Sequence, residues 1–277
     1  MSIIYNEQQK TFSLDAQLQE FSSFQQGDFR TSSMEVVNSD GSLVFGGRVK
    51  DYSIRSGKYM LKRLPSCFST EADTADTLEI TLVDAVSNVE VTLLYGVFEE
   101  RDIITRAAIV KNAGSGPIHL NKIMSACLDF PNGSDKELIS FYGRYGQEKQ
   151  VERYPLTHHI HRFESGRGSS SHQQTPFMIL CDHDTTEDFG NCCGMALMYS
   201  GNFLAEAEFD QYDQLRLQIG INNKNFHYLI ESGETFVAPE VVMTCTDKGL
   251  SELSHIYHDF IRLVNVTMTN QALVTGM

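Results

Sequence analysis

Strict alternation of apolar and polar residues constrains this chain more than any other feature. Leu78, Ile80 and Leu82 are separated by polar residues, and the same period of two returns in Val89–Leu93 after the polar turn Asp84–Asn88. Because successive side chains of a β-strand point to opposite faces of a sheet, each run predicts a strand with one buried face. Together the two runs predict a β-hairpin.

Similar patterns continue along most of the chain. The Asp-Gly pair inside Asn38–Ser42 is typical of a tight turn, and we expect a second hairpin whose strands flank it. A strand over Ile103–Val110 ends at the breaker Lys111–Pro117. Later strands are expected at Phe177–Cys181, Gly194–Ser200, Leu204–Phe209, Leu215–Ile219, His227–Ile230 and Phe236–Cys245. This spacing predicts an all-β chain built as a large antiparallel sandwich.

One late segment has a different period. From Gly249 to Val264 the apolar residues recur at helical spacing and form one stripe, which predicts an amphipathic helix. Thr246 or Asp247 is a suitable cap for its start. Residues Thr267–Met277 show no clear pattern, and we expect them to fray.

The charge of the chain limits its partners. Its 277 residues include 36 acidic and 22 basic side chains, a formal net charge of −14. Such a surface repels nucleic-acid phosphates and anionic lipid head groups, whereas a neutral sugar is compatible with it. No apolar run predicts a transmembrane helix, and the first residues do not have the pattern of a secretory signal. We expect a cytoplasmic protein that binds neither nucleic acid nor membrane.

The cysteines predict neither disulfides nor a metal centre. Because no secretory signal is recognised, we expect reduced, buried thiols. Cys192 and Cys193 are neighbours, so in a strand they would point to opposite faces and would not bind one metal ion together. No Cys-x-x-Cys pair is present, which argues against a zinc site. The six cysteines are Cys67, Cys127, Cys181, Cys192, Cys193 and Cys245.

The stretch Thr157–Thr175 is rich in His, Gly, Ser and Arg and has no periodicity. It predicts a long loop, either functional or simply a solvated connection. Its run Ser169–His172 places hydroxyls beside an imidazole, but triad partners converge from separate segments, so we favour a loop that hydrogen-bonds to itself. His158, His159 and His161 form a tight group, of which the last two would share a face of a strand and could chelate a metal. No cysteine or carboxylate pair lies at ligand spacing, so we favour the absence of a metal site.

Carboxylates alone do not indicate a glycosidase site. Retaining hydrolysis of a glycoside needs two carboxyl groups about 5 Å apart. Asp28, Asp129, Glu148 and Glu240 lie beside Gly, Pro or aromatic residues that suggest fixed conformations. For each of the four we favour a role in supporting loops.

Aromatic residues offer one candidate for sugar contact. Sugar rings pack their apolar faces against aromatic side chains, but this chain has no Trp. Tyr142, Tyr145 and Tyr154 surround Gly143 and Gly146. This pattern predicts either an exposed aromatic on a glycine-rich turn or ordinary tyrosines of a sandwich.

Several short strings occur in an order that is specific as a set, although each is weak alone. They are Gly27–Arg30, Gly57-Lys58, Leu64-Pro65, Asp76–Ile80, Ser125–Pro131, Arg167–His172, Tyr199–Phe203 and Pro239–Val242. On these strings the chain resembles the N-terminal domain of the bacterial family 36 α-galactosidases. The resemblance extends from about Gln19 to the end of the helical segment.

The resemblance implies a β-supersandwich over residues 1–246, followed at residues 247–277 by a linker helix and tail that would lead into a (β/α)8 barrel. In the family that barrel carries both catalytic aspartates, the nucleophile within a Lys-Trp-Asp motif. We therefore expect no catalytic residue in these 277 residues. The implied family activity is retaining hydrolysis of terminal α-galactosides such as melibiose and raffinose, with no organic cofactor and no metal.

The resemblance also points to residues near the substrate. Family members carry a Gly-x-Trp-x-x-Glu segment, which Gly143–Glu148 matches with Tyr145 in the Trp position. Tyr145, Arg144 and His172 are the expected sugar-binding residues. An early-loop aspartate of the family cannot be mapped, because the segment that carries it is deleted before Glu20. This deletion and the missing barrel together suggest a truncated gene product.

The resemblance further implies a scaffold that forms homo-oligomers and shapes the entrance for an α-galactoside. The alternative is a free-standing module that binds galactose or a galactoside.

Overall fold

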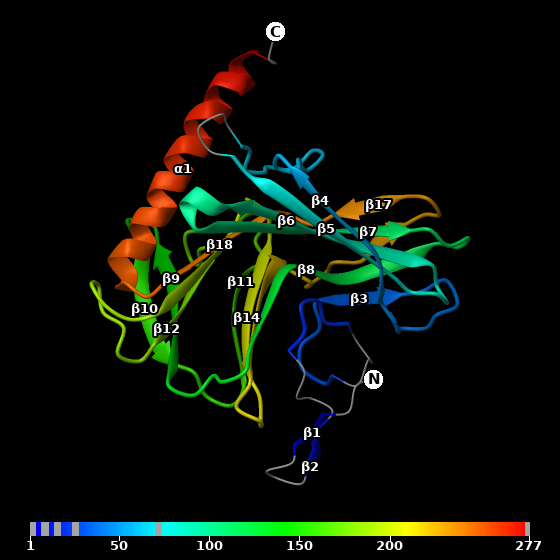
Figure 1. The fold of residues 1–277 in the computed structure, drawn as a ribbon, viewed down its shortest axis with the longest axis horizontal. Helices are drawn as coiled ribbons and strands as arrows, with labels where there is room; N and C mark the ends of the chain where they lie inside the picture. Colours follow the sequence, from blue (N-terminus) through cyan, green and yellow to red (C-terminus); the bar gives the residue numbers. More distant parts are fainter. Residues whose placement is uncertain (1–3, 7–10, 14–17, 24–27, 70–73, 275–277) are drawn as a thin grey trace.

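The main body of the described structure is formed by two facing antiparallel sheets with one long helix. The computed structural model in Figure 1 describes residues 4–6, 11–13, 18–23, 28–69 and 74–274, with helix side chains described as far as Arg262. Within these residues one sheet has ten strands and the other six, and α1 (Gly249–Val274) lies against β13 and β18 of the larger sheet. The predicted all-β sandwich with a C-terminal helix is confirmed.

The larger sheet has the strand order β10-β9-β12-β13-β18-β7-β6-β5-β4, and β17 also pairs with β7. Its strands are β4 (Arg48–Ser56), β5 (Asp76–Val83), β6 (Val89–Phe98), β7 (Ile103–Asn112), β9 (Lys136–Arg144), β10 (Gln147–Pro155), β12 (Phe177–Asp182), β13 (Cys192–Leu197), β17 (Thr235–Val237) and β18 (Val241–Thr246).

The smaller sheet has the order β11-β14-β15-β8-β16, and β3 also pairs with β8. Its strands are β3 (Met34–Val37), β8 (Ile118–Phe130), β11 (Ile160–Ser165), β14 (Phe203–Phe209), β15 (Leu215–Ile221) and β16 (Tyr228–Ile230). Strands β1 (Ile4–Asn6) and β2 (Thr11–Ser13) form a separate hairpin.

The hairpin predicted from the alternating runs is formed by β5 and β6. Leu82 lies opposite Val91, and Ile80 lies opposite Leu93. Val91 and Leu93 are buried in a core cluster together with Leu120 of the smaller sheet. The alternation therefore buries one face of this hairpin between the two sheets, as expected.

The hairpin predicted around Asn38–Ser42 is wrong, although the turn itself is present. The Asn38 N–H donates to the Ser42 carbonyl at 2.8 Å, and Gly41 has a φ of +83°. However, β3 before the turn pairs with β8, and β4 after it pairs with β5 in the other sheet. The turn reverses the chain, and the chain then crosses between sheets.

Two other strand predictions need correction. The expected loop Thr157–Thr175 contains β11, which pairs with β14 along its whole length. Of its inward positions only Phe163 is apolar, so the sequence shows no alternation there. The expected single strand Phe236–Cys245 is two strands, β17 and β18, interrupted at Pro239, which has no N–H to donate.

Helix α1 packs one stripe of residues onto the larger sheet. Leu253, Tyr257 and Phe260 are buried, and the Phe260 ring contacts Phe98 edge-on with centroids 5.0 Å apart. The Tyr257 hydroxyl donates to the Val242 carbonyl at 3.0 Å. The helix continues to Val274, beyond the predicted end at Val264, and the fraying expected from Thr267 stays a prediction.

The first turn of α1 is capped by a loop rather than by Thr246 or Asp247. The amides of Leu250 and Ser251 donate to the carbonyls of Thr186 and Glu187 at 3.0 and 2.9 Å. Gly249 has a φ of +84°, and a Cβ there would lie 2.6 Å from the Glu187 carbonyl oxygen. Only glycine therefore allows this close approach.

The expectation that all cysteines are reduced is wrong for one pair. Cys193 of β13 faces Cys245 of β18, with their Cα atoms 4.0 Å apart, and the two form a disulfide. Cys192 packs under α1, on the opposite face from Cys193, as predicted. The remaining cysteines are buried and free, and burial raises the pKa of the Cys181 and Cys192 thiols to about 11.

Reduction of the Cys193–Cys245 disulfide is expected to lower the free energy of unfolding by about 2–4 kcal/mol, because the bridge joins residues 52 apart and restricts the unfolded chain. Urea unfolding with and without dithiothreitol measures the difference. The C193S/C245S double variant should unfold at the midpoint of the reduced protein under both conditions. Identical midpoints for oxidised and reduced wild-type protein would contradict the prediction.

Candidate functional site

The structure places the two segments that carry the predicted sugar-binding residues side by side, and Arg144, Tyr145 and His172 are all exposed. Tyr145 lies at the tip of the β9–β10 hairpin and is 92% exposed. The Gly143 N–H donates to the Gln173 carbonyl at 3.1 Å, which holds the hairpin beside the loop that carries His172. A Cβ on Gly143 would lie 3.0 Å from the His172 carbonyl oxygen, so glycine lets the two segments approach.

The tip of the hairpin is held by its own side chains. The Arg144 guanidinium donates to the Gln147 side chain at 2.7 Å, and the Glu148 carboxylate accepts from the Gly146 N–H at 2.9 Å. Glu148 therefore supports the turn, as favoured from the sequence. The exposed surface of the hairpin tip offers an aromatic face and hydrogen-bonding groups.

The Ser-His string serves the loop itself. The Ser171 hydroxyl accepts from the Gln173 N–H at 3.0 Å, and the Ser170 N–H donates to the Ser200 carbonyl at 2.8 Å. The Gly168 N–H donates to the Asn202 side chain at 2.6 Å. These bonds connect the loop to the Tyr199–Phe203 string, so both strings share a structural role. The favoured self-bonded loop is confirmed in this respect.

The histidine group does not form a metal site. The rings of His159 and His161 stack with centroids 4.0 Å apart, and the Nδ1 of His159 lies 2.9 Å from the Thr157 hydroxyl. Burial, with the neighbouring His159, lowers the pKa of His161. His158 pairs instead with Asp213 at 3.0 Å. In the part of the chain that the structure describes, no group of three or more His, Cys, Asp or Glu residues could hold a metal ion.

Asp28 and Asp129 belong to a buried ion network and not to a catalytic pair. Both carboxylates lie 2.7 Å from the Arg216 Nη2, and Arg30 contacts them at 2.8 and 3.3 Å. Each of these four side chains is at most 4% exposed. A substrate cannot reach carboxylates that are enclosed and neutralised in this way.

Glu240 is likewise structural. It is fully buried, pairs with the ammonium of Lys58, and accepts from the Cys67 N–H at 2.5 Å. The favoured role of all four carboxylates in supporting the fold is thus consistent with their contacts.

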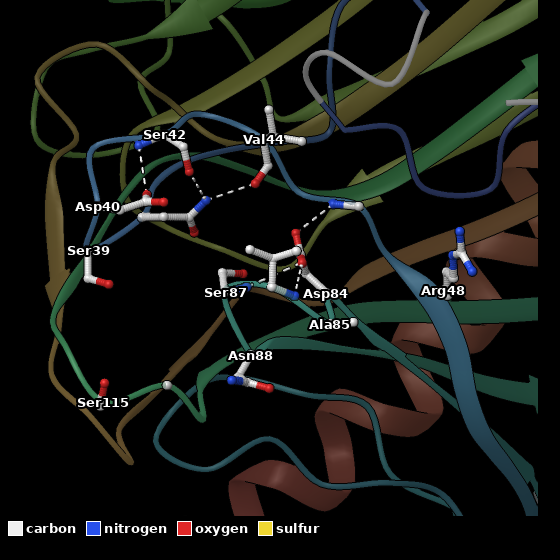
Figure 2. Close-up of a pocket in the computed structure, with 14 residues that line it drawn as sticks. Ser39, Asp40, Ser42, Val44, Arg48, Asp84, Ala85, Ser87, Asn88 and Ser115 are labelled. Atoms are coloured by element: carbon white, nitrogen blue, oxygen red, sulfur yellow. Dashed lines mark hydrogen bonds between the residues drawn. The ribbon is translucent and has the colours of Figure 1, made fainter.

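A second feature was missed by sequence reasoning. A cavity of about 670 Å³, lined by both polar and apolar atoms, lies between three turns, at residues 38–46, 84–88 and 114–115 (Figure 2). The sequence marked these segments only as turns, since nothing local shows that strands from both sheets bring them together. No helix among the described residues is long and apolar enough to cross a membrane.

Comparison with known proteins identifies the fold. Residues 2–231 match the glycosyl hydrolase family 36 N-terminal domain. The chain belongs to glycosyl hydrolase family 36. This family 36 domain is 47% identical over 253 residues to the bifunctional alpha-galactosidase/sucrose kinase AgaSK of Mediterraneibacter gnavus, covering 91% of this chain and 27% of that protein. It is 41% identical to alpha-galactosidase AgaA of Geobacillus stearothermophilus, covering 91% of this chain and 35% of that protein.

Solved structures agree with this assignment. A crystal structure of AgaA from Geobacillus stearothermophilus in complex with raffinose superposes with a TM-score of 0.88 at 40% identity, covering 93% of this chain and 36% of that one. The galactosidase domain of AgaSK gives a TM-score of 0.89 at 44% identity, and the superposition covers 95% of this chain and 37% of that one. The family 36 domain thus spans about a third of the length of these relatives.

Proposed function

We propose that this chain is the noncatalytic N-terminal part of an α-galactosidase, in which hydrolysis of terminal α-galactosides such as melibiose or raffinose occurs on a part of the protein outside these 277 residues. The observation that carries the proposal is the match to about a third of several α-galactosidases. The contacts of Asp28, Asp129, Glu148 and Glu240 are consistent with it, because each carboxylate is held by the fold.

Within such an enzyme, the domain would act as a scaffold and shape the entrance to the substrate. The exposed ring of Tyr145, with Arg144 and His172 nearby, supports this role because aromatic faces pack against sugar rings. Homo-oligomers and a cytoplasmic location remain part of the proposal. Sedimentation velocity of the purified chain tests for homo-oligomers. The Cys193–Cys245 disulfide counts against a cytoplasmic location, since disulfides are rare in the cytosol.

The purified chain alone is expected to show no turnover of a chromogenic α-galactoside, even at high protein concentration. Full-length AgaA serves as the positive control. Turnover that persists through further purification would contradict the proposal, because it would require a carboxylate pair within this chain.

A chimera tests the role of the surface around Tyr145. Residues of this chain replace the matching third of AgaA, and the chimera should hydrolyse raffinose. Tyr145→Ala in the chimera should raise KM with a smaller effect on kcat, because it removes binding contacts remote from the reacting bond. Tyr52→Ala is the matched control, since Tyr52 is also exposed but lies on β4, at the opposite edge of the sheet from β10. Equal KM values for both variants would remove Tyr145 from the entrance.

The second candidate is a free-standing module that binds galactose or a galactoside through Tyr145. Its exposed ring is the observation in favour. Ligand-detected NMR with galactose tests it, and the absence of saturation transfer, or transfer unchanged by Tyr145→Ala, would exclude it.

A further inference from the structure

The cavity between the three turns is partly open to solvent, and hydrogen bonds join these turns around it. The Asp84 carboxylate accepts from the Gly46 N–H at 2.7 Å and from the Val86 N–H at 2.8 Å, which joins two of the three turns (Figure 2). The Ala113 N–H donates to the Asn88 carbonyl at 3.1 Å, and this bond joins the turn at residues 114–115 to the turn at residues 84–88. Sites for small molecules are usually preformed in this way.

Around the cavity lie side chains with hydrogen-bonding capacity that the protein does not use. Figure 2 shows Ser39 and Ser115 on one side of the cavity and Arg48 on the other. These three side chains and that of Asn88 have no hydrogen bond or ion pair with any described residue. By contrast Arg55, further along the same strand as Arg48, is paired with Glu79 at 2.9 Å.

Asn38, in the wall of the cavity, also has an unused acceptor. It is only 6% exposed, and its Nδ2 donates to the Ser42 hydroxyl at 3.0 Å and the Val44 carbonyl at 2.8 Å. Its Oδ1 has no hydrogen-bond partner among the described residues. This oxygen is closed to solvent, so a ligand in the cavity cannot reach it, and Asn38 contributes by holding the wall through its Nδ2.

The chemistry of the walls selects the class of ligand. Hydroxyl, amide and guanidinium groups provide both donors and acceptors, while apolar atoms, including those of Ala85 and the 88% exposed Val86, make up more than half of the lining. The carboxylates of Asp40 and Asp84 outnumber Arg48, which disfavours anions. The volume lies within the range of small-molecule sites, about 300–1,000 Å³. A neutral molecule with many hydroxyl groups fits these conditions.

We propose that this cavity binds a short neutral oligosaccharide at a site separate from the surface that carries Tyr145. The choice of raffinose as the probe rests on the proposed function; the site itself rests on its own residues. In a protein of this family, such a site would hold a sugar away from the turnover site and raise its local concentration.

Saturation-transfer NMR titration of the full chain with raffinose tests the proposal. Wild-type protein should show saturable binding, and Arg48→Gln should weaken it about tenfold, the usual effect of losing one hydrogen bond from a charged donor. The S39A/S115A variant should weaken binding by a smaller factor. Arg55→Gln is the matched control, since it removes an exposed arginine from the same strand outside the cavity, and circular dichroism confirms that each variant is folded.

Three outcomes decide the matter. Weaker binding in Arg48→Gln, with Arg55→Gln unchanged, supports the cavity. Binding that Tyr145→Ala abolishes and Arg48→Gln preserves overturns it, and so does the absence of saturable binding by the wild-type chain. If the AgaA chimera is active but the chain alone does not bind raffinose, only this inference is overturned. If the chain binds raffinose but the chimera is inactive, only the proposed function is overturned.

Discussion

Replacing Arg216 with methionine is expected to lower the free energy of unfolding by about 3–5 kcal/mol. The Arg216 side chain is fully buried and lies 2.7 Å from both Asp28 and Asp129. It also donates to the Thr31 carbonyl at 3.0 Å. Without its guanidinium, the two buried carboxylates share only Arg30, and an uncompensated buried charge is strongly unfavourable. Urea unfolding followed by circular dichroism measures the loss.

Arg162→Met is the matched control for this experiment. Arg162 pairs with the buried Glu206, but its side chain is 45% exposed, and Glu206 keeps Lys122 at 2.8 Å. The control should therefore cost no more than about 1 kcal/mol. The double variant D129L/R216M should recover part of the loss, because removing both partners leaves no unpaired charge between them. A loss in Arg216→Met no larger than in Arg162→Met would show that the network does not hold the segment around Asp28.

The same network predicts a dependence on pH. Burial raises the pKa of Asp28, but the hydrogen bond from Arg30 and the charges of Arg216 and Arg30 outweigh it, so the pKa lies below its ordinary value of 3.8. The ionised carboxylate therefore contributes stability that is present above pH 3.8 and is lost as the pH falls through the lower pKa of the folded protein. In Arg216→Met, the part of the stability that is lost on acidification should be smaller than in the wild-type protein.

Local patterns in the sequence were sufficient where one element determines its own structure. The alternation in β5 and β6 and the apolar stripe of α1 each specify a buried face without reference to distant residues. The turn at Asn38–Ser42 was also correct as a turn, but its flanking strands join different sheets. The partner of β3 is β8, far along the chain, and no local pattern carries that information.

Contacts between distant residues explain the other differences. The Cys193–Cys245 disulfide depends on the register of β13 with β18, and the network around Asp28 joins residues 188 positions apart. The resemblance to a family named Tyr145, Arg144 and His172 as sugar-binding residues, which stays a prediction; the structure shows that the segments carrying them are neighbours. The cavity of Ser39, Arg48 and Asn88 had no motif to mark it, since its turns converge only in the folded chain.

Replacing Glu240 with leucine is the second substitution with a large expected effect, also about 3–5 kcal/mol. Glu240 is the partner of the Lys58 ammonium, whose side chain is 1% exposed and crosses Gly96, where a Cβ would lie 2.4 Å from the lysine Cδ. Glu240 also accepts from the Cys67 N–H, so it joins the segment after β4 to the start of β18. Its loss leaves the buried ammonium without a counter-ion, with the Tyr59 carbonyl at 3.2 Å as its acceptor, and leaves the Cys67 amide without its Glu240 acceptor.

The pH profile separates this explanation from simple mispacking. Burial lowers the pKa of Lys58, and the charge of Glu240 opposes that effect. In Glu240→Leu the pKa should fall further, so the unfolded chain binds more protons than the folded one, and stability should rise as the pH approaches 10.5, the ordinary value for lysine. Thermal unfolding between pH 7 and pH 10 measures this slope. The K58M/E240L double variant should lose the added slope and recover most of the stability. Glu79→Leu, which removes the half-buried partner of the exposed Arg55, should change the stability little. If the double variant were as unstable as Glu240→Leu, the loss would come from the Cys67 amide and the packing of β18 rather than from the unpaired lysine.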